Sequence, residues 1–283
     1  MNVAQALDRA ASQLKEAGIE SALPDAELLL RHVLGWDRAT LYAEAGALVP
    51  PSEEGTFFSL VQKRGRRRPL QHLTGRQAFW GREFLVGPDV LIPRPETEIL
   101  VEAALGRLLG VADPLVVDVG TGSGCIALSL AAERPDAEVH ATEISPPALA
   151  VARENARRLR LTERVRFHEG DLLEPLRQLE GRLHLVASNP PYVDPREAPH
   201  LAPEVRDHEP AVALFPGPDP YALYRRLAPA SARMLRPGGS LLLEIGQGME
   251  SEVVRLLAEA GLRVARVIPD LQGIPRTVVA ERE

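Results

Sequence analysis

The most specific chemistry in the sequence belongs to Asn189, Pro190, Pro191 and Tyr192, at the end of a strand-like run at 183–189. Two prolines cannot continue a central strand, because each lacks a backbone N–H and has a fixed φ. The residue before a proline is held extended, which limits how Asn189 presents its side chain. The sequence therefore predicts a stiff turn that exposes two acceptors, the Asn189 side-chain oxygen and the Pro190 carbonyl, beside the flat face of Tyr192.

Two acceptors in such a turn suit a planar amide or amine nitrogen, whose lone pair is delocalised and poorly nucleophilic. Acceptors that hold its two N–H groups would favour pyramidalisation and aim the lone pair at an electrophile, and such orientation lowers a barrier by roughly 7–11 kcal/mol in favourable cases. They would also stabilise the positive charge that develops on nitrogen. A strand-ending turn with a buried tyrosine is the alternative without a ligand. We expect Asn189, Pro190 and Tyr192 to be catalytic, with Pro191 also contacting the substrate.

A glycine-rich loop, Gly120-Thr121-Gly122-Ser123-Gly124, follows the buried-strand run at 114–120 and precedes a helical segment. Ligands of open α/β sheets bind beyond the carboxyl ends of the strands, and glycines there allow positive φ and close approach of ligand atoms. The dinucleotide pattern G-x-G-x-x-G would need a third glycine where Cys125 stands. The G-x-G-x-G spacing, introduced by Asp118, fits the amino-acid end of S-adenosylmethionine better than a pyrophosphate. A tight turn without a ligand is the alternative.

Acidic residues end the next two strand-like segments. Glu143 stands where a carboxylate can accept both ribose hydroxyls of an adenosine-containing cofactor. Asp171 is placed to accept from the adenine amino group, with Leu172 packed on the adenine ring, although Asp171 could instead be a helix N-cap. A sulfonium is already a strong electrophile, so we expect no metal. The residues expected to bind S-adenosylmethionine, with S-adenosylhomocysteine as product, are Gly120, Thr121, Gly122, Ser123, Gly124, Glu143, Asp171 and Leu172.

The segments that position these residues alternate between strand and helix from about residue 96. Such alternation predicts a largely parallel sheet covered by helices on both faces. A long loop is expected at 190–218, and Ser145 is expected to be an N-cap with prolines in the first turn of its helix. Strands are predicted at 114–120, 137–144, 164–170, 183–189, 240–246, 263–269 and 276–282, and helices at 96–109, 125–135, 147–160, 219–235 and 248–260.

The N-terminal part has a different pattern, with apolar residues three and four apart and helices predicted at 2–18, 25–35, 38–46 and 52–66. Short aromatic and β-branched runs between glycines then indicate a β-hairpin. We therefore expect a helical domain at 1–69, a β-hairpin connector at 70–93 and an α/β domain at 94–283.

Composition excludes several classes of protein. The 283 residues contain one cysteine, so neither an internal disulfide nor a cysteine-based zinc site is expected. A formal net charge of -6 argues against an enzyme that grips duplex nucleic acid. No signal peptide and no apolar stretch long enough to cross a membrane is visible. A cytoplasmic protein without a membrane or direct nucleic-acid partner is the expectation.

Further motifs lie outside the glycine loop, the Asn189 turn and the helical domain: His72–Gly75, Leu91–Glu98, and Pro203–Arg206 leading to Glu209-Pro210. With these motifs, the sequence resembles over nearly its whole length the bacterial protein glutamine N5-methyltransferases that act on peptide chain release factors. The resemblance implies that Asn189 contacts the cofactor as well as the substrate. The resemblance implies the fold of class I S-adenosylmethionine methyltransferases, Rossmann-like with a mostly parallel seven-stranded sheet, preceded by a small helical domain that recognises the substrate. It also implies that the substrate is the glutamine of the Gly-Gly-Gln loop in class 1 release factors. Glu143 stands where Asp is common in that family, and Leu172 where an aromatic is frequent.

Two basic features have more than one interpretation. Arg94 is either a pocket-wall residue that guides the substrate or a structural ion-pair partner of Glu96 or Glu98. The cluster of Arg64, Arg66, Arg67 and Arg68 is either a surface for RNA or an acidic partner, or a solvated helix end.

Other functions remain open from the sequence. A sister enzyme acting on a ribosomal-protein glutamine, or a methyltransferase for an exocyclic amine such as adenine N6, could use the same turn. A nicotinamide-dependent oxidoreductase is disfavoured by the missing third glycine. A non-catalytic binding module is disfavoured by the intact acceptor turn.

Overall fold

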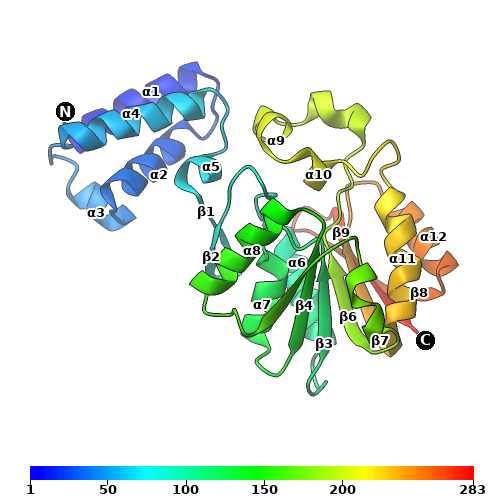
Figure 1. Cartoon of the computed structure of the whole chain (residues 1–283). Coiled ribbons are helices and arrows are strands. Elements are labelled where there is room, and N and C mark those ends of the chain that lie inside the picture. Colours follow the sequence, from blue (N-terminus) through cyan, green and yellow to red (C-terminus); the bar gives the residue numbers. More distant parts are fainter. The chain divides into compact units, whose positions relative to one another are not determined.

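The computed structural model describes all 283 residues, and they form two compact units (Figure 1). The first comprises Met1–Arg76 and Ala202–His208, and the second comprises Gln77–Leu201 and Glu209–Glu283. This division differs from the domain boundaries expected from sequence. Residues 70–76 belong to the helical unit, and so does a short segment from the middle of the expected 190–218 loop.

The helical unit consists of α1 (Val3–Glu16), α2 (Ala22–Leu34), α3 (Arg38–Ala43), α4 (Pro51–Gly65), α5 (Leu70–Thr74) and α9 (Pro203–His208). The first helix begins at a capping box, in which the side chain of Asn2 accepts from the backbone of Gln5 and the side chain of Gln5 accepts from the backbone of Asn2. The apolar stripes of α1, α2 and α4 meet in one core that contains Leu14, Leu29 and Phe57. Helix periodicity thus predicted the first four helices, with ends differing by a few residues.

The basic cluster is only partly a solvated helix end. Arg66 and Arg68 are exposed, but Arg64 is buried. Its Nε lies 2.7 Å from a carboxylate oxygen of Asp25 in α2, and one terminal nitrogen lies 2.8 Å from Glu204 in α9. The expectation of a solvated end is therefore wrong for Arg64, because two carboxylates within the same unit neutralise it.

The β-hairpin is shorter than the expected connector. Its strands are β1 (Arg76–Phe79) and β2 (Arg82–Leu85), which form a two-stranded sheet, while residues 70–74 are the helix α5. At the far end of the hairpin, the Asn155 side chain accepts from the backbone N–H of Leu85 and donates to its carbonyl. This pair of hydrogen bonds attaches the hairpin to the helix α8 (Pro146–Arg158).

The second unit is built on a seven-stranded sheet of order β5-β4-β3-β6-β7-β9-β8. The first five strands in this order are parallel, and β9 runs antiparallel to both β7 and β8. All seven predicted strands are present, as β3 (Leu115–Val119), β4 (Glu138–Glu143), β5 (Val165–Glu169), β6 (Leu183–Ser188), β7 (Leu235–Glu244), β8 (Leu262–Pro269) and β9 (Pro275–Arg282).

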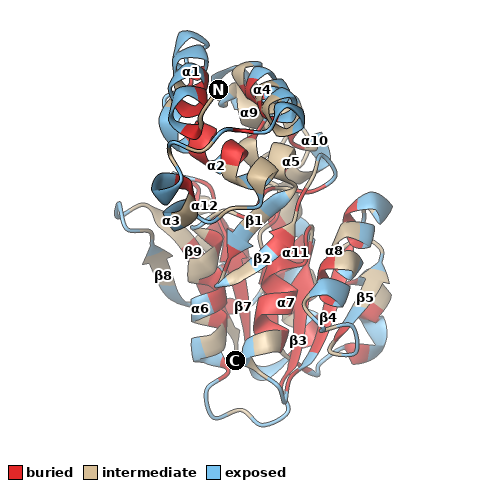
Figure 2. Cartoon of the chain, turned by 90° about the vertical axis from the view of Figure 1, so that its left-hand side faces the viewer, coloured by how far each residue is buried: buried red, intermediate tan, exposed pale blue.

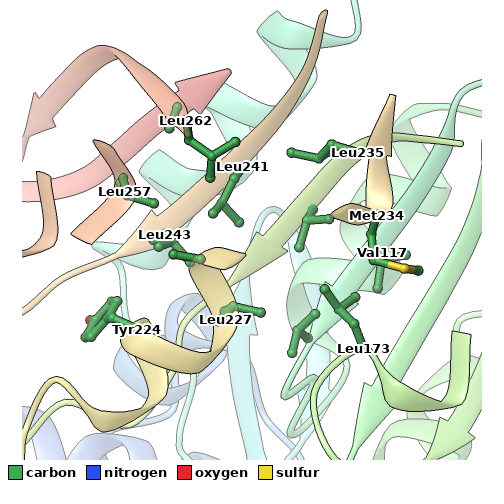
Figure 3. Packing of buried hydrophobic residues seen from close by; sticks show 14 of the residues in the cluster. Val117, Leu173, Tyr224, Leu227, Met234, Leu235, Leu241, Leu243, Leu257 and Leu262 are labelled. Carbon is green, nitrogen blue, oxygen red and sulfur yellow. The ribbon is translucent and has the colours of Figure 1, made fainter. Parts of the chain in front are cut away.

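Helices cover both faces of this sheet, as the alternating pattern predicted. Neighbouring residues of β3 point to opposite faces: Val117 packs with Tyr224 and Leu227, whereas Val116 packs with Leu100. Figure 3 shows the first of these two cores, and Figure 2 shows that the central strands are buried while the helices expose their outer sides. The covering helices are α11 (Ala222–Met234) and α12 (Glu250–Glu259) in the first core, and α6 (Thr97–Arg107) and α7 (Cys125–Glu133) in the second.

The expected long loop at 190–218 contains three short helices instead. They are η2 (Pro195–His200), the helix α9 of the helical unit and α10 (Ala211–Leu214), and a further short helix, η1 (Glu174–Leu179), precedes β6. Proline lies at the start of η2 and α9, where its fixed φ suits the first turn. None of the helices is long and apolar enough to span a membrane.

Candidate active site

A single cavity of about 250 Å³ lies at the carboxyl ends of the parallel strands of the second unit. Strands β3 and β6 are parallel neighbours, so the loops that follow them begin at the same end of the sheet. The cavity is lined by most of the residues that the sequence singled out: Arg94, Gly120, Thr121, Gly122, Ser123, Glu143, Asp171, Leu172, Asn189, Pro190 and Pro191. Gly124 and Tyr192 are not among the lining residues. The glycine loop and the Asn189 turn therefore face the same space.

The glycine loop takes its shape from left-handed backbone conformations and from Asp118. Gly122 has φ +55°, and Gly124 has φ +83° with so little space that an added Cβ would lie 2.9 Å from Leu128. The buried carboxylate of Asp118 accepts from the Thr121 hydroxyl at 2.6 Å and from the Ala127 backbone at 3.1 Å. Burial raises the pKa of Asp118 to about 7. The acidic residue that introduces the motif thus holds the loop and does not line the cavity.

Glu143 joins the glycine loop to the next strand. One carboxylate oxygen accepts from the backbone N–H of Gly122 at 2.9 Å, and the other accepts from Ser145 at 2.9 Å. Each oxygen of an ionised carboxylate has two lone pairs. The side chain lines the cavity, so each oxygen has one lone pair left for a further donor, and its contact with the hydroxyls of a ribose remains a prediction.

At the third strand end, Asp171 forms an ion pair with Arg226 of α11, a partner that no sequence motif indicated. The N-cap position of η1 is Leu173, so Asp171 is not the cap that was its alternative interpretation. Leu172 follows with a positive φ of 49°, an uncommon conformation for a residue with a branched side chain. Both Asp171 and Leu172 line the cavity, and their contacts with adenine remain a prediction.

Asn189 is held by two residues that sequence reasoning missed. Its side-chain nitrogen donates to the hydroxyl of Thr97 at 3.2 Å, and Thr97 donates to Glu244 at 2.6 Å. Thr97 is the first residue of α6, and Glu244 is the last residue of β7. Burial raises the pKa of the Glu244 carboxyl to about 7. A carboxylate inside the otherwise apolar run at 240–246 was the signal that could have identified it.

Tyr192 lies behind the cavity and packs against the core of the unit. Its ring rests on Gly246, where an added Cβ would lie 2.9 Å from the ring. Burial raises the pKa of Tyr192 to about 12, so the phenol is neutral at physiological pH. The tyrosine therefore supports the turn from behind, and its contact with a substrate remains a prediction.

Arg94 pairs with neither of the glutamates expected from sequence. Its guanidinium donates to Glu209, whose side chain is almost fully buried, and Glu98 accepts instead from the backbone of Trp80. The expected pairing with Glu96 or Glu98 is therefore wrong, because Glu209 approaches Arg94 from a distant part of the chain. Arg94 is partly exposed and also lines the cavity, so this one residue both forms an ion pair with Glu209 and lies in the pocket wall.

Comparisons with known proteins agree with this architecture. Residues 5–75 match the family model described as PrmC N-terminal domain, and residues 96–205 match that of the methyltransferase small domain. A solved methyltransferase structure from Pyrococcus furiosus covers 72% of this chain and 91% of its own, with a TM-score of 0.52 at 17% identity. Fold and domain match indicate a class I S-adenosylmethionine-dependent methyltransferase.

Relatives of the full length are much more similar. A release factor glutamine methyltransferase from Cereibacter sphaeroides is 44% identical over 99% of this chain and 98% of its own length. One from Moorella thermoacetica is 44% identical over 100% of this chain and 99% of its own. By this identity along the whole chain, the protein belongs to the family of release factor glutamine methyltransferases.

Proposed function

We propose that this protein transfers a methyl group from S-adenosylmethionine to the side-chain amide nitrogen of a glutamine in a peptide chain release factor. The observation that carries the proposal is that Asn189 and Pro190 line the same cavity as the glycine loop. Family membership supports the choice of substrate, because the relatives are named for release factors. The glutamine of the Gly-Gly-Gln motif in class 1 release factors is the proposed acceptor.

The residues present fit the cofactor. Glycines with positive φ let the amino-acid end approach the backbone, and Glu143 has lone pairs left for a ribose. Asp171, Leu172 and Arg226 would surround the adenine. When bound, the cofactor would supply an electrophilic methyl group on a sulfonium and would leave as the thioether S-adenosylhomocysteine. The methylated amide nitrogen would be strongly acidic and would release one proton to water, so the proposal includes neither a metal nor a strong general base.

The protein's own contribution is to orient and polarise the glutamine. The Asn189 oxygen and the Pro190 carbonyl would accept from the two N–H groups of the substrate amide. This grip holds the nitrogen out of conjugation and directs its lone pair along one line. A positioned group of this kind contributes about 100- to 1000-fold in rate when it also stabilises charge in the transition state. Arg94 would guide the approaching loop of the substrate from the cavity wall.

The deciding experiment offers the purified protein several acceptors with methyl-labelled S-adenosylmethionine. We expect label on a class 1 release factor and a mass increase of one methyl group on the peptide that contains Gly-Gly-Gln. A release factor with that glutamine changed to alanine is the matched control and should remain unlabelled.

The same assay tests the alternatives. Label on a ribosomal-protein glutamine or on adenine in DNA or RNA, with none on the release factor, would replace the proposed substrate. Binding of NADH without binding of S-adenosylmethionine would reject methyl transfer altogether.

A further inference from the structure

Three side chains from distant parts of the second unit form a short chain of hydrogen bonds behind the turn. Glu244 accepts from the Thr97 hydroxyl at 2.6 Å, and the Asn189 amide nitrogen lies 3.2 Å from the same hydroxyl. Thr97 and Glu244 are each only 2% exposed. Thr97 also lines the cavity, whereas Glu244 does not, and the proposed function assigns neither of them a contact with cofactor or substrate.

The numbers of donors and acceptors allow only one orientation of the Asn189 amide. An ionised carboxylate only accepts hydrogen bonds, and a hydroxyl has one proton to donate. Thr97 gives its proton to Glu244, so it can only accept from Asn189. The NH2 group of Asn189 therefore faces Thr97, and its side-chain oxygen faces away from the Thr97 hydroxyl.

We infer that Thr97 and Glu244 are positioning residues that keep the Asn189 oxygen, and not its nitrogen, directed at the substrate. The inference rests on the proposed function, in which that oxygen accepts from the glutamine N–H. In the reverse orientation, the Asn189 NH2 would meet the substrate NH2, and two donors would face each other. A group that fixes the orientation of an amide thus selects for a substrate that donates hydrogen bonds.

Replacing Thr97 with valine removes the hydroxyl but keeps the shape of the side chain. We expect kcat to fall about 10- to 100-fold, which corresponds to one lost hydrogen bond at a buried group. The affinity for S-adenosylhomocysteine should change less than about threefold, because the glycine loop and Glu143 that bind this ligand are untouched by the change. Thr97→Ser keeps the hydroxyl and should restore kcat to within about threefold of the original.

The relative kcat values of the valine and serine variants of Thr97 distinguish a positioning role of this residue from a packing role. If Thr97 acted only by filling space, valine would be harmless and serine would be the damaging change. Thr277→Val is a matched control, because the Thr277 hydroxyl is buried on the neighbouring strand β9 without a hydrogen-bond partner. This control should retain full kcat. A valine variant of Thr97 that is as active as the Thr277 control overturns the inference.

A second variant tests the carboxylate. In Glu244→Gln the new amide can donate to Thr97, which frees the Thr97 proton to meet the Asn189 oxygen, so both orientations of the Asn189 amide become possible.

Because burial raises the pKa of Glu244 to about 7, kcat of the original protein should rise with pH through that region as the carboxylate ionises. The variant should lose this rise, and a rise that persists would belong to another group and overturn the role of Glu244. The charged and titratable groups around Glu244 are Glu96 and Arg276, together with Tyr192, Tyr224 and Cys125.

A measurement without turnover distinguishes a failure of this inference from a failure of the proposed function. In protein labelled with nitrogen-15 at asparagine, the side-chain NH2 of Asn189 should exchange slowly with solvent. Thr97→Val should accelerate this exchange, and Thr277→Val should not. Exchange in the original protein as fast as in an exposed amide would overturn the inference, whichever substrate is methylated.

Discussion

Asn189 and Glu143 both line the cavity, yet their hydrogen bonds give them separate roles. The Asn189 NH2 group donates to Thr97, so its side-chain oxygen is the group left for a substrate. Glu143 accepts from two backbone N–H groups and holds the glycine loop in place. Substitutions at the two positions should therefore affect different steps.

Asn189→Ala should reduce methyl transfer by about 100- to 1000-fold, because one of the two acceptors for the substrate amide is lost. Binding of S-adenosylhomocysteine should change little, since the glycine loop and Glu143 remain intact. Single-turnover rates with labelled cofactor, together with calorimetric titration, separate the two quantities. Transfer at the original rate would contradict the proposed grip on the amide.

Glu143→Ala is the complementary change. It removes the acceptors for the ribose and for the Gly122 and Ser145 backbones, so we expect weaker cofactor binding before any change in the rate from the bound state. A loss of about 1.5–3 kcal/mol, or roughly 10- to 150-fold in the dissociation constant, is typical for hydrogen bonds to a charged group. Unchanged cofactor affinity would remove Glu143 from the proposed binding site.

At the scale of elements, the turn after β7 supports the turn after β6. Gly246 leaves room for the Tyr192 ring on one side and for Met249 on the other. Gly246→Ala would bring a Cβ within 2.9 Å of both, so the ring must shift. We expect kcat/KM for the acceptor to fall about 10-fold or more, because displacements of this size disturb near-attack geometry.

Gly106→Ala provides a control for the loss of glycine itself. Gly106 lies within α6, and a Cβ added there would have no atom within 4 Å, so this change should preserve activity and slightly favour the helix. If Gly246→Ala were as active as Gly106→Ala, the support of Tyr192 by the neighbouring turn would be unimportant for function.

The loop between β3 and α7 should make stability depend on pH. Because burial raises the pKa of Asp118 from 3.8 to about 7, the folded protein keeps a proton that the unfolded chain releases. The resulting stabilisation is complete below the unfolded pKa and is lost as pH rises through about 7. Asp118→Asn has no such proton, so its unfolding free energy should fall less between pH 5 and pH 8, by about 2–3 kcal/mol.

Hydrogen exchange of β3 and α7 amides at pH 5 and pH 8 measures this difference in unfolding free energy within the second unit. Asparagine can still accept from Thr121 and Ala127, so the loop should keep its shape. Identical changes with pH in the variant and the original protein would show that Asp118 does not hold the proton.

At the scale of the whole molecule, the helical unit is built from two separate stretches of chain. Arg64 of α4 joins them by pairing with Asp25 in α2 and with Glu204 in α9. Removal of one partner from a buried ion pair leaves an uncompensated charge, so Arg64→Ala should destabilise this unit by about 3–5 kcal/mol.

Arg66→Ala removes an exposed arginine from the same cluster and should change stability by no more than about 0.5 kcal/mol. Hydrogen exchange of α2 and α4 amides measures the stability of the helical unit in both variants. Equal protection in the two variants would contradict the structural role of Arg64.

Local features of this protein could be predicted from its sequence because their physical causes are local. The glycine loop depends on positive φ at neighbouring positions, and the Asn189 turn depends on two prolines. Short continuous apolar runs predicted the buried strands, and apolar residues three and four apart predicted the N-terminal helices; together with the segments between them, these runs predicted every strand of the seven-stranded sheet. Family resemblance over the same motifs indicated the methyltransferase fold before any contact was known.

Only the tertiary structure decided which side chains meet. Thr97 and Glu244 are 147 residues apart in sequence, and Arg94 and Glu209 are 115 apart. No periodic pattern encodes such pairs, because they depend on the order of strands in the sheet and on where each loop returns. For the same reason, the sequence did not reveal the ion pair between Asp171 and Arg226 or the pairing of Arg64 with Asp25 and Glu204.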